Sequence, residues 1–221
     1  MEAAERVREY FTRSAVGFDS LYSEEKISPF MRLLNRYFRR DIYERYLRSL
    51  EHVRRYRLES ILDVGCGSGR YELGLAQLPD TSRMVGIDFS SLMIALALEN
   101  IRPVQNSGKS LEFFCRDFAK FETDETFDAI LAMGFFDYIR DPVPVLEKMR
   151  KLARHSVAAS FPSISFYRTP LRKTRYFFKR CPVYFYTPEK ILALSKAAGF
   201  ARVETQKIKG SGMDYFATFY S

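Results

Sequence analysis

ILDVGCGSGR, residues 61–70, decides the fold that this sequence predicts, because it runs from an apolar segment through three closely spaced glycines. The apolar residues before the first glycine are typical of a buried strand, and a helical pattern begins after the last glycine. Gly65, Gly67 and Gly69 allow backbone N–H groups to approach a ligand closely, next to the positive end of the helix. The stretch therefore predicts a strand, a ligand-binding loop and a helix.

The spacing of the glycines separates this loop from two common nucleotide-binding loops. A dinucleotide fingerprint, G-x-G-x-x-G, would need its third glycine at the position of Arg70. A phosphate-binding P-loop would continue with Gly-Lys-Ser or Gly-Lys-Thr, and neither follows here. The pattern that stands in the sequence is D-x-G-x-G-x-G, which begins at Asp63.

Two further acidic residues follow the next two predicted strands. Asp88 ends the strand in GIDFS, where a carboxylate can accept hydrogen bonds from both hydroxyls of a ribose. Asp117, in CRDF, follows the third strand. Because ligands of open α/β sheets bind in the crevice outside the carboxyl ends of the strands, all three strand ends are expected to face one ligand.

From Ser60 onward, short apolar runs alternate with helical patterns. Alternation of this kind predicts parallel βαβ units and an α/β sheet covered by helices on both faces. Asp141 before Pro142 and Thr187 before Pro188 are expected to cap two helices, and Gly199 to end one. The expected parallel strands are residues 60–64, 83–88, 111–115, 127–133 and 155–161.

The two ends of the chain differ from this pattern. Residues 201–208 and 214–221 flank a Gly-Ser-Gly turn and predict an antiparallel hairpin. Residues 1–58 contain helical patterns only, with apolar residues at three-to-four spacing from residue 28 to 57 and the arginines expected on the outer face. We expect residues 1–58 to form a helical lid over a domain of residues 59–221.

Composition narrows the class of protein. The 221 residues include 35 Lys and Arg against 27 Asp and Glu, a net charge of +8, and 47% hydrophobic residues, which suits a globular protein. No apolar run is long enough to cross a bilayer and the first ten residues do not resemble a signal peptide, so we expect a cytoplasmic protein. Three scattered cysteines and two histidines disfavour disulfides and metal catalysis.

The motif LDVGCGSG, residues 62–69, resembles the first motif of the class I S-adenosylmethionine-dependent methyltransferases. The resemblance covers residues 60–221 and implies a Rossmann-like, seven-stranded, mostly parallel sheet whose last strand is antiparallel. VREYF and FDSLY, near the N-terminus, are similar to segments of the ubiquinone-type and magnesium-protoporphyrin O-methyltransferases.

The family resemblance implies which residues hold S-adenosyl-L-methionine. The loop backbone would surround the methionine part with Asp63 in support, Asp88 would bind the ribose, and Asp117 would accept from the adenine amino group. Separately from the resemblance, a positively charged sulfonium suits an aromatic wall, which Tyr10 or Phe11 on the predicted N-terminal helix could supply. The full set of expected cofactor-binding residues is Asp63, Gly65, Cys66, Gly67, Ser68, Gly69, Asp88, Phe89, Met93, Asp117, Phe118, Met133, Gly134 and Tyr10.

Methyl transfer from a sulfonium is an in-line displacement with a neutral leaving group, so positioning supplies much of the catalysis and a dedicated base is optional. Asp137 and Tyr138, in GFFDYIRDP, are the candidates for a direct role, whereas Cys66 is expected to be a small buried residue rather than a nucleophile. The Asn/Asp-Pro-Pro-Tyr element of adenine and glutamine N-methyltransferases is absent. The interpretation we favour is therefore O-methylation of a small molecule.

The segment of about residues 162–187 is expected to be an insertion on the acceptor side. Six Lys or Arg side chains alternate there with aromatic residues, and we predict that Arg172, Arg175 and Tyr176 bind an anionic or lipid-like acceptor, with contact to a membrane surface as one form of this. A solvated basic face and a single-stranded nucleic acid site are alternatives. RNA or protein methylation, a catalytically silent cofactor-binding module, and a monomer or a homodimer also stay open.

Overall fold

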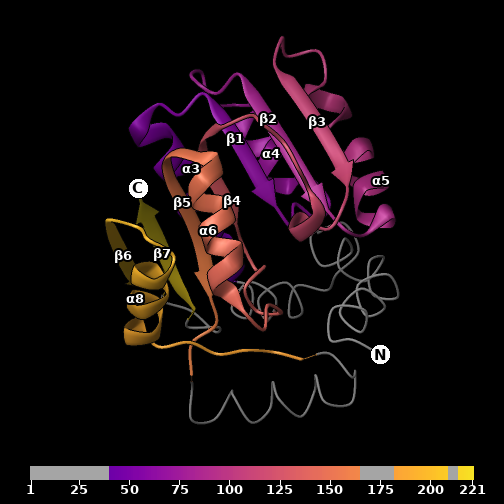
Figure 1. The fold of residues 1–221 in the computed structure, drawn as a ribbon. Coiled ribbons are helices and arrows are strands. Elements are labelled where there is room, and N and C mark those ends of the chain that lie inside the picture. The colour runs from indigo at the N-terminus through magenta and orange to yellow at the C-terminus, as the bar shows by residue number, and fades with distance from the viewer. Residues whose placement is uncertain (1–39, 165–181, 209–213) are drawn as a thin grey trace, which may run out of the picture.

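The computed structural model describes residues 40–164, 182–208 and 214–221, and its centre is a sheet of seven strands in the order β3-β2-β1-β4-β5-β7-β6 (Figure 1). Neighbouring strands from β3 to β5 pair in parallel, and β7 is antiparallel to both β5 and β6. The predicted α/β sheet with an antiparallel last strand is therefore confirmed. The strands are β1 Ser60–Val64, β2 Arg83–Asp88, β3 Ser110–Cys115, β4 Phe127–Ala132, β5 Ala153–Phe161, β6 Arg202–Lys207 and β7 Tyr215–Tyr220.

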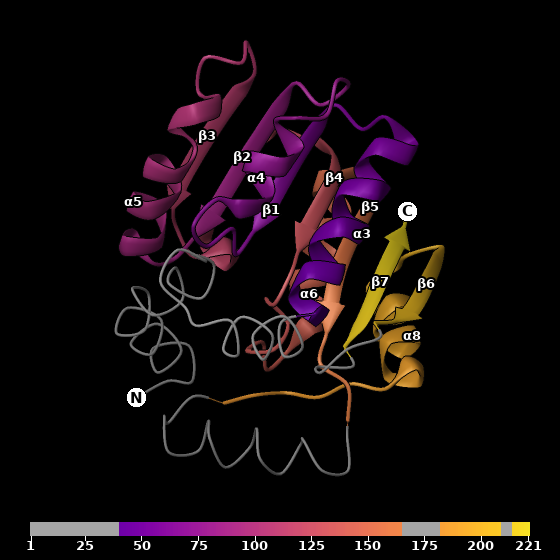
Figure 2. The same ribbon diagram turned by 180° about the vertical axis from the view of Figure 1, so that it is seen from behind.

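Helices cover both faces of the sheet. Figure 1 shows α6 (Pro142–Leu152) and α8 (Pro188–Ala197) in front of the sheet. Figure 2, from behind, shows α3 (Arg40–Tyr56), α4 (Arg70–Leu75) and α5 (Ser91–Asn100) on the other face. None of the described helices is long and apolar enough to span a membrane.

The two faces of the sheet build two separate cores, because side chains of a strand alternate between faces. Leu62 of β1 packs in the same core as Leu146 of α6, whereas its neighbour Ile61 belongs to the core of Leu75 and Val53, from α4 and α3. All five side chains are at most 1% exposed. Strands with both faces covered read as continuous apolar runs, which is why the sequence located them.

The predicted helix starts are confirmed, with one correction. The Thr187 hydroxyl accepts a hydrogen bond from the Lys190 N–H at 3.3 Å, as an N-cap should. Asp141 also precedes the first residue of its helix, but its side chain makes no capping hydrogen bond. A cap normally accepts from the second or third N–H of the helix, and the third position is Pro144, which has none.

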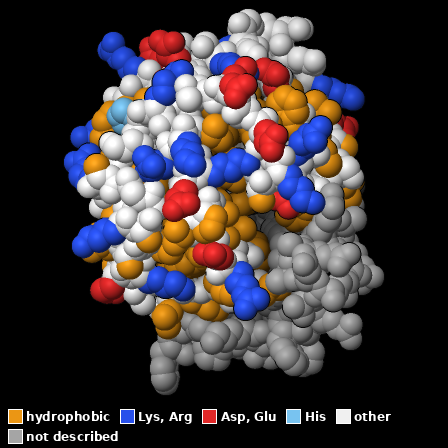
Figure 3. All heavy atoms as spheres, viewed as in Figure 1, with side chains coloured by type: hydrophobic (Ala, Val, Ile, Leu, Met, Phe, Trp, Pro, Cys, Tyr) orange, Lys and Arg blue, Asp and Glu red, His pale blue; other side chains and the backbone are white. Residues whose placement is uncertain are grey.

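The charged side chains on the face shown in Figure 3 are spread out rather than gathered. Lys and Arg side chains are distributed over the described surface, and Asp and Glu side chains lie among them. The net charge of +8 therefore does not form one basic patch on the described part of this face.

Helix α3 is joined to the sheet by a buried polar contact. The imidazole Nε2 of His52 lies 2.7 Å from the hydroxyl of Ser156 on β5, and both residues are buried. Burial lowers the pKa of His52 from 6.5 to about 4, with smaller contributions from His155 and Arg55. His52 is therefore neutral in the folded protein at physiological pH.

We predict that His52 makes the fold sensitive to mild acid. Its folded pKa lies below its unfolded pKa, so the unfolded chain binds the extra proton and stability falls as the pH drops from 6.5 towards 4, by about 3 kcal/mol in all. His52→Gln keeps a hydrogen-bonding side chain that does not titrate and should flatten this part of the profile. Urea unfolding of both proteins at several pH values measures the difference, and parallel profiles would contradict the prediction.

Candidate active site

The glycine loop folds back onto the end of the neighbouring strand. The N–H groups of Gly65 and Cys66 donate to the carbonyl oxygen of Ile87, at 2.7 and 3.1 Å. Gly69 has a φ of 75°, and a Cβ there would lie 3.1 Å from the Cβ of Ala97 on α5. Only glycine fits that position without strain, and its lack of a side chain lets the loop pack closely against α5.

Asp88 fastens the middle of the loop. One carboxylate oxygen accepts from the N–H of Gly67 at 3.1 Å, and the other accepts from the N–H of Ser90 at 2.8 Å. Burial raises the pKa of Asp88, and these two N–H donors counteract part of that rise. The structure thus brings the predicted ribose acid against the predicted loop, at the carboxyl ends of β1 and β2.

The loop and the start of α5 carry three more of the predicted residues. Phe89 follows it and is half-buried. Met93 is buried in the first turn of α5, where its N–H donates to the hydroxyl of Ser90 at 3.4 Å. Ser68 is half-buried in the loop, and its carbonyl accepts from the side chain of Asn100 at 3.1 Å.

The third strand end carries Asp117 and Phe118. Asp117 is exposed and caps the short turn η2 (Phe118–Lys120) by accepting from the N–H of Ala119 at 3.0 Å. Phe118 is buried, and its ring meets the ring of Phe135 edge-on at 6.4 Å between centroids. Because Phe135 follows β4, this contact brings the ends of β3 and β4 to one place.

Arg45, which the sequence analysis did not single out, helps to hold the turn after β4. The N–H of Gly134 donates to the Ser160 hydroxyl at 2.7 Å, and the guanidinium of Arg45 donates to the same oxygen at 3.1 Å. Arg45 also lies 3.7 Å from the buried carboxylate of Asp214. Met133, the other residue predicted here, is half-buried beside Gly134.

The expectation that the arginines of this helix lie on its outer face is therefore wrong for Arg45, whose side chain is only 13% exposed. Ser160 and Asp214 give it polar partners from β5 and the start of β7, which compensates for burying the charge. A signal was present in the sequence, since Arg45 shares a helical face with the buried residues Ser49, His52 and Val53.

The loop between β4 and α6 contains Asp137 and Tyr138. Asp137 is 4% exposed, and its carbonyl accepts from the N–H of Tyr184 at 2.8 Å. The hydroxyl of the buried Tyr186 donates to the carbonyl of Phe136 at 3.1 Å. Tyr138 is half-buried. The chain that enters α8 therefore holds this loop in place.

Two buried carboxyl groups lie beneath the glycine loop. Asp63 and Glu72 are 2% and 1% exposed. Burial and neighbouring acids raise the pKa of Asp63 to about 8 and that of Glu72 well above its usual range. Burial next to these acids also raises the pKa of the Cys66 thiol, which fits a packing role better than that of a nucleophile.

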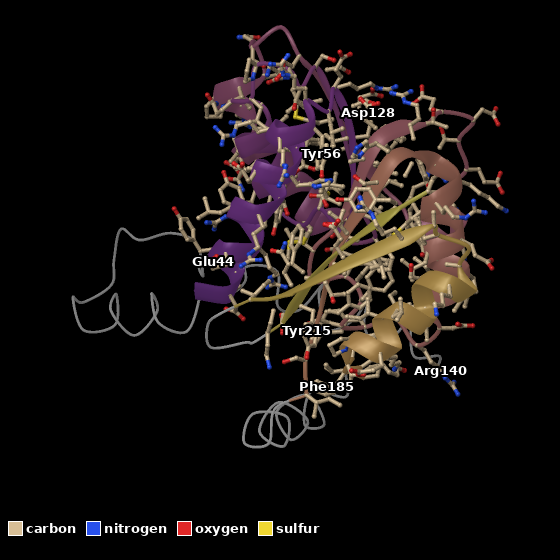
Figure 4. All side chains as sticks on the ribbon, turned by 90° about the vertical axis from the view of Figure 1, so that its left-hand side faces the viewer. Glu44, Tyr56, Asp128, Arg140, Phe185 and Tyr215 are labelled. Atoms are coloured by element: carbon tan, nitrogen blue, oxygen red, sulfur yellow. The ribbon has the colours of Figure 1, made fainter. Side chains whose placement is uncertain are left out.

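Four of the predicted site residues are not among those that the structure describes. Tyr10, Arg172, Arg175 and Tyr176 lie outside the described residues. Figure 4 shows Tyr56 and Asp128 at the end of the sheet opposite to Phe185, Arg140 and Tyr215, which belong to the end where the site forms. Among the residues described, no group of three or more His, Cys, Asp or Glu could hold a metal ion.

Comparison with known proteins places this geometry in a family. The family described as "Methyltransferase domain" matches residues 57–175, more than half of the chain. The chain belongs to that family.

Particular relatives agree with this membership. Over 99 residues the chain is 30% identical to a malonyl-[acyl-carrier protein] O-methyltransferase of Bacillus anthracis, which is 43% of this chain and 35% of that protein. It is also 30% identical, over 91 residues, to pavine N-methyltransferase of Thalictrum flavum subsp. glaucum, covering 41% of this chain and 25% of the relative. The matches thus span about a third or less of these relatives.

A solved structure supports the fold over nearly the whole chain. Magnesium protoporphyrin IX methyltransferase from Synechocystis PCC 6803, with bound SAH, superposes with a TM-score of 0.75 at 19% identity, covering 97% of this chain and 98% of that one. At this identity the likeness establishes the Rossmann-like methyltransferase fold.

We predict that the buried acids beneath the loop cost stability as the pH rises. The folded pKa of Glu72 lies above its unfolded value, so its contribution to stability is lost as the pH rises above 4.5. Glu72→Gln should raise the free energy of unfolding measurably at pH 7 and change it little at pH 4, because only the unfolded chain releases the Glu72 proton between these pH values. Urea unfolding at both pH values measures this, with the exposed Glu99→Gln as control; an equal effect at the two values would contradict it.

Proposed function

We propose that the chain is an S-adenosylmethionine-dependent methyltransferase that methylates an oxygen atom of a small anionic acceptor. The observation that carries the proposal is the contact between Asp88 and the N–H of Gly67, because it joins the D-x-G-x-G-x-G loop to an acid at the end of β2. Membership of the methyltransferase domain family supports the same reaction class.

The chemistry of the described residues fits this cofactor. The carboxylate of Asp88 retains acceptor capacity for ribose hydroxyls, since each carboxylate oxygen accepts more than one hydrogen bond. Burial and acidic neighbours raise the pKa of Asp63 and Glu72, and a ligand that carries a sulfonium and an ammonium would oppose this rise, so this side of the loop suits such a ligand. When bound, the cofactor supplies a methyl group already activated on positive sulfur.

The remaining cofactor contacts in the proposal follow the strand ends. Phe89 and Met93 would pack against the adenine, and Asp117 with the N–H of Phe118 would bind its edge. The backbone of Met133 and Gly134 would face the methionine part, on a turn that Arg45 and Ser160 hold. Tyr10, which belongs to the expected N-terminal lid, would cover the sulfonium.

Two considerations support an anionic acceptor: the substrate named for a relative, and the fact that a carboxylate needs no general base. The malonyl group named in the Bacillus relative ends in a carboxylate, which is a nucleophile without loss of a proton. An acceptor of this kind needs orientation rather than a base, and orientation alone supplies roughly 7–11 kcal/mol of the barrier. In the proposal Arg172, Arg175 and Tyr176 bind the acceptor, while Asp137 and Tyr138 line the path between acceptor and methyl group.

We predict that Asp88→Ala weakens binding of S-adenosylhomocysteine roughly tenfold to a hundredfold, because a charged group that holds the ribose costs about 1.5–3 kcal/mol to remove. Calorimetry of the folded variant measures the dissociation constant, with the exposed Asp80→Ala as the matched control. Nicotinamide dinucleotides should bind the unsubstituted chain at least a hundredfold more weakly. An unchanged constant in Asp88→Ala would mean that the site is misplaced.

The reaction itself is tested by transfer of a radiolabelled methyl group to a whole extract of the source organism, which is then separated into small molecules, RNA and protein. A methyl ester of a carboxylate releases labelled methanol in mild base, whereas an N-methyl or ether product keeps its label. Arg172→Ala with Arg175→Ala should raise the Michaelis constant for the acceptor at least tenfold and leave cofactor affinity nearly unchanged. Arg54→Ala with Arg55→Ala, in the exposed last turn of α3, is the control. Base-stable label would overturn the carboxylate acceptor, and label on RNA or protein would overturn the small molecule.

A further inference from the structure

Lys148, on α6, makes three hydrogen bonds to a single turn on the cofactor side of the sheet. Its ammonium donates to the carbonyl oxygens of Phe118 at 2.8 Å and Ala119 at 3.2 Å, and also to that of Phe121. These carbonyls belong to η2 and to the residue after it. The three donors of one ammonium group therefore converge on the turn that carries Asp117 and Phe118.

The turn needs an external support. Its own backbone contributes two short-range hydrogen bonds, from Lys120 N–H to Asp117 and from Phe121 N–H to Phe118, at 2.9 and 3.2 Å. A single 3₁₀ turn has poor hydrogen-bond geometry and is not stable alone. Lys148 belongs to α6, outside the turn, and its three hydrogen bonds supply such a support.

A second contact connects Lys148 with the wall of the site. Its ammonium lies 5.0 Å from the ring centroid of Phe118, whose ring meets that of Phe135. Burial lowers the pKa of Lys148, while Glu122 and Asp117 oppose that shift. The Lys148 ammonium therefore lies between the backbone carbonyls of the turn and the ring of Phe118, and is half-buried.

We propose that Lys148 is a positioning residue that fixes the adenine-side wall of the cofactor site by holding the turn of Asp117 and Phe118. The proposal rests on the proposed function, because it assigns the turn to the adenosine part of the cofactor. Lys148 acts through the turn and is not itself a catalytic residue.

A pair of ligands separates positioning from general stability. S-adenosylhomocysteine contains both the adenosine and the amino acid part, whereas methylthioadenosine lacks the amino acid part. Lys148→Met keeps most of the apolar stem and removes the ammonium, so it should weaken both ligands by the same factor, at least fivefold. Asp63→Asn, on the methionine side, should weaken S-adenosylhomocysteine more than methylthioadenosine.

Calorimetry of the full chain measures these constants, and thermal unfolding is followed in parallel. Lys151→Met, an exposed position on the same helix, is the matched control and should change neither ligand by more than twofold. Lys148→Arg should restore part of the affinity, because it keeps the charge and the donors but its rigid planar fork does not match the compact ammonium in geometry. It also serves as the second variant if the methionine variant does not fold.

Three outcomes would overturn the proposal. If Lys148→Met lowers the unfolding temperature but leaves both dissociation constants unchanged, Lys148 contributes to stability only. Loss of S-adenosylhomocysteine binding without loss of methylthioadenosine binding would place its effect on the wrong side of the site. Failure of the unsubstituted chain to bind either ligand would overturn the proposed function together with this assignment.

Discussion

The site depends on the connection between the end of β1 and the end of β2. Gly65 and Cys66 donate to Ile87, and Gly67 donates to Asp88, so successive N–H groups of the loop are used to fasten it to the neighbouring strand. The other oxygen of Asp88 accepts from Ser90, whose hydroxyl caps α5. One carboxylate therefore sets the shape of the glycine loop and the start of the next helix together. A parallel sheet makes this feasible, because paired strands deliver their ends to the same edge.

The sequence predicted the sheet, the loop and the place of Asp88 because each of them has a local signature. Buried parallel strands are continuous apolar runs in the sequence. The left-handed backbone conformation at Gly69 favours glycine, so the loop is also visible in the sequence. Lys148 has no such signature, and the only sign for Arg45 is that it shares a helical face with Ser49, His52 and Val53. Arg45 is buried because Ser160 and Asp214 meet it, and Lys148 is useful because three carbonyls of a distant turn converge on it. Contacts of this kind exist only after the chain has folded, so a charged residue on a helix reads as solvent-exposed until its partners are known.

The two buried acids beneath the glycine loop cost folding free energy. Asp63 and Glu72 are both buried, and acidic neighbours add to the rise of each pKa: Asp88 acts on both groups, and Asp63 acts on Glu72. Carboxyl groups perturbed in this way cluster at functional sites. Gly86 makes room for the carboxylate, since a Cβ there would lie 2.8 Å from an oxygen of Glu72 and 2.7 Å from the ring of Phe113. The small residue on β2 and the acid on α4 are therefore one arrangement, maintained at a cost in folding free energy.

The boundary of the family match at residue 57 does not coincide with a boundary in the packing of the structure, and this limits how the protein can evolve by recombination. The match starts at residue 57, directly after α3 ends at Tyr56, yet α3 supplies Arg45 to the turn at Gly134 and His52 to the back of β5. A module exchanged at residue 57 by recombination would lose both contacts and leave Ser156 and Ser160 without their partners on the helix. The helix and the two serines must therefore be inherited as one unit, although they lie on opposite sides of the boundary that sequence similarity draws.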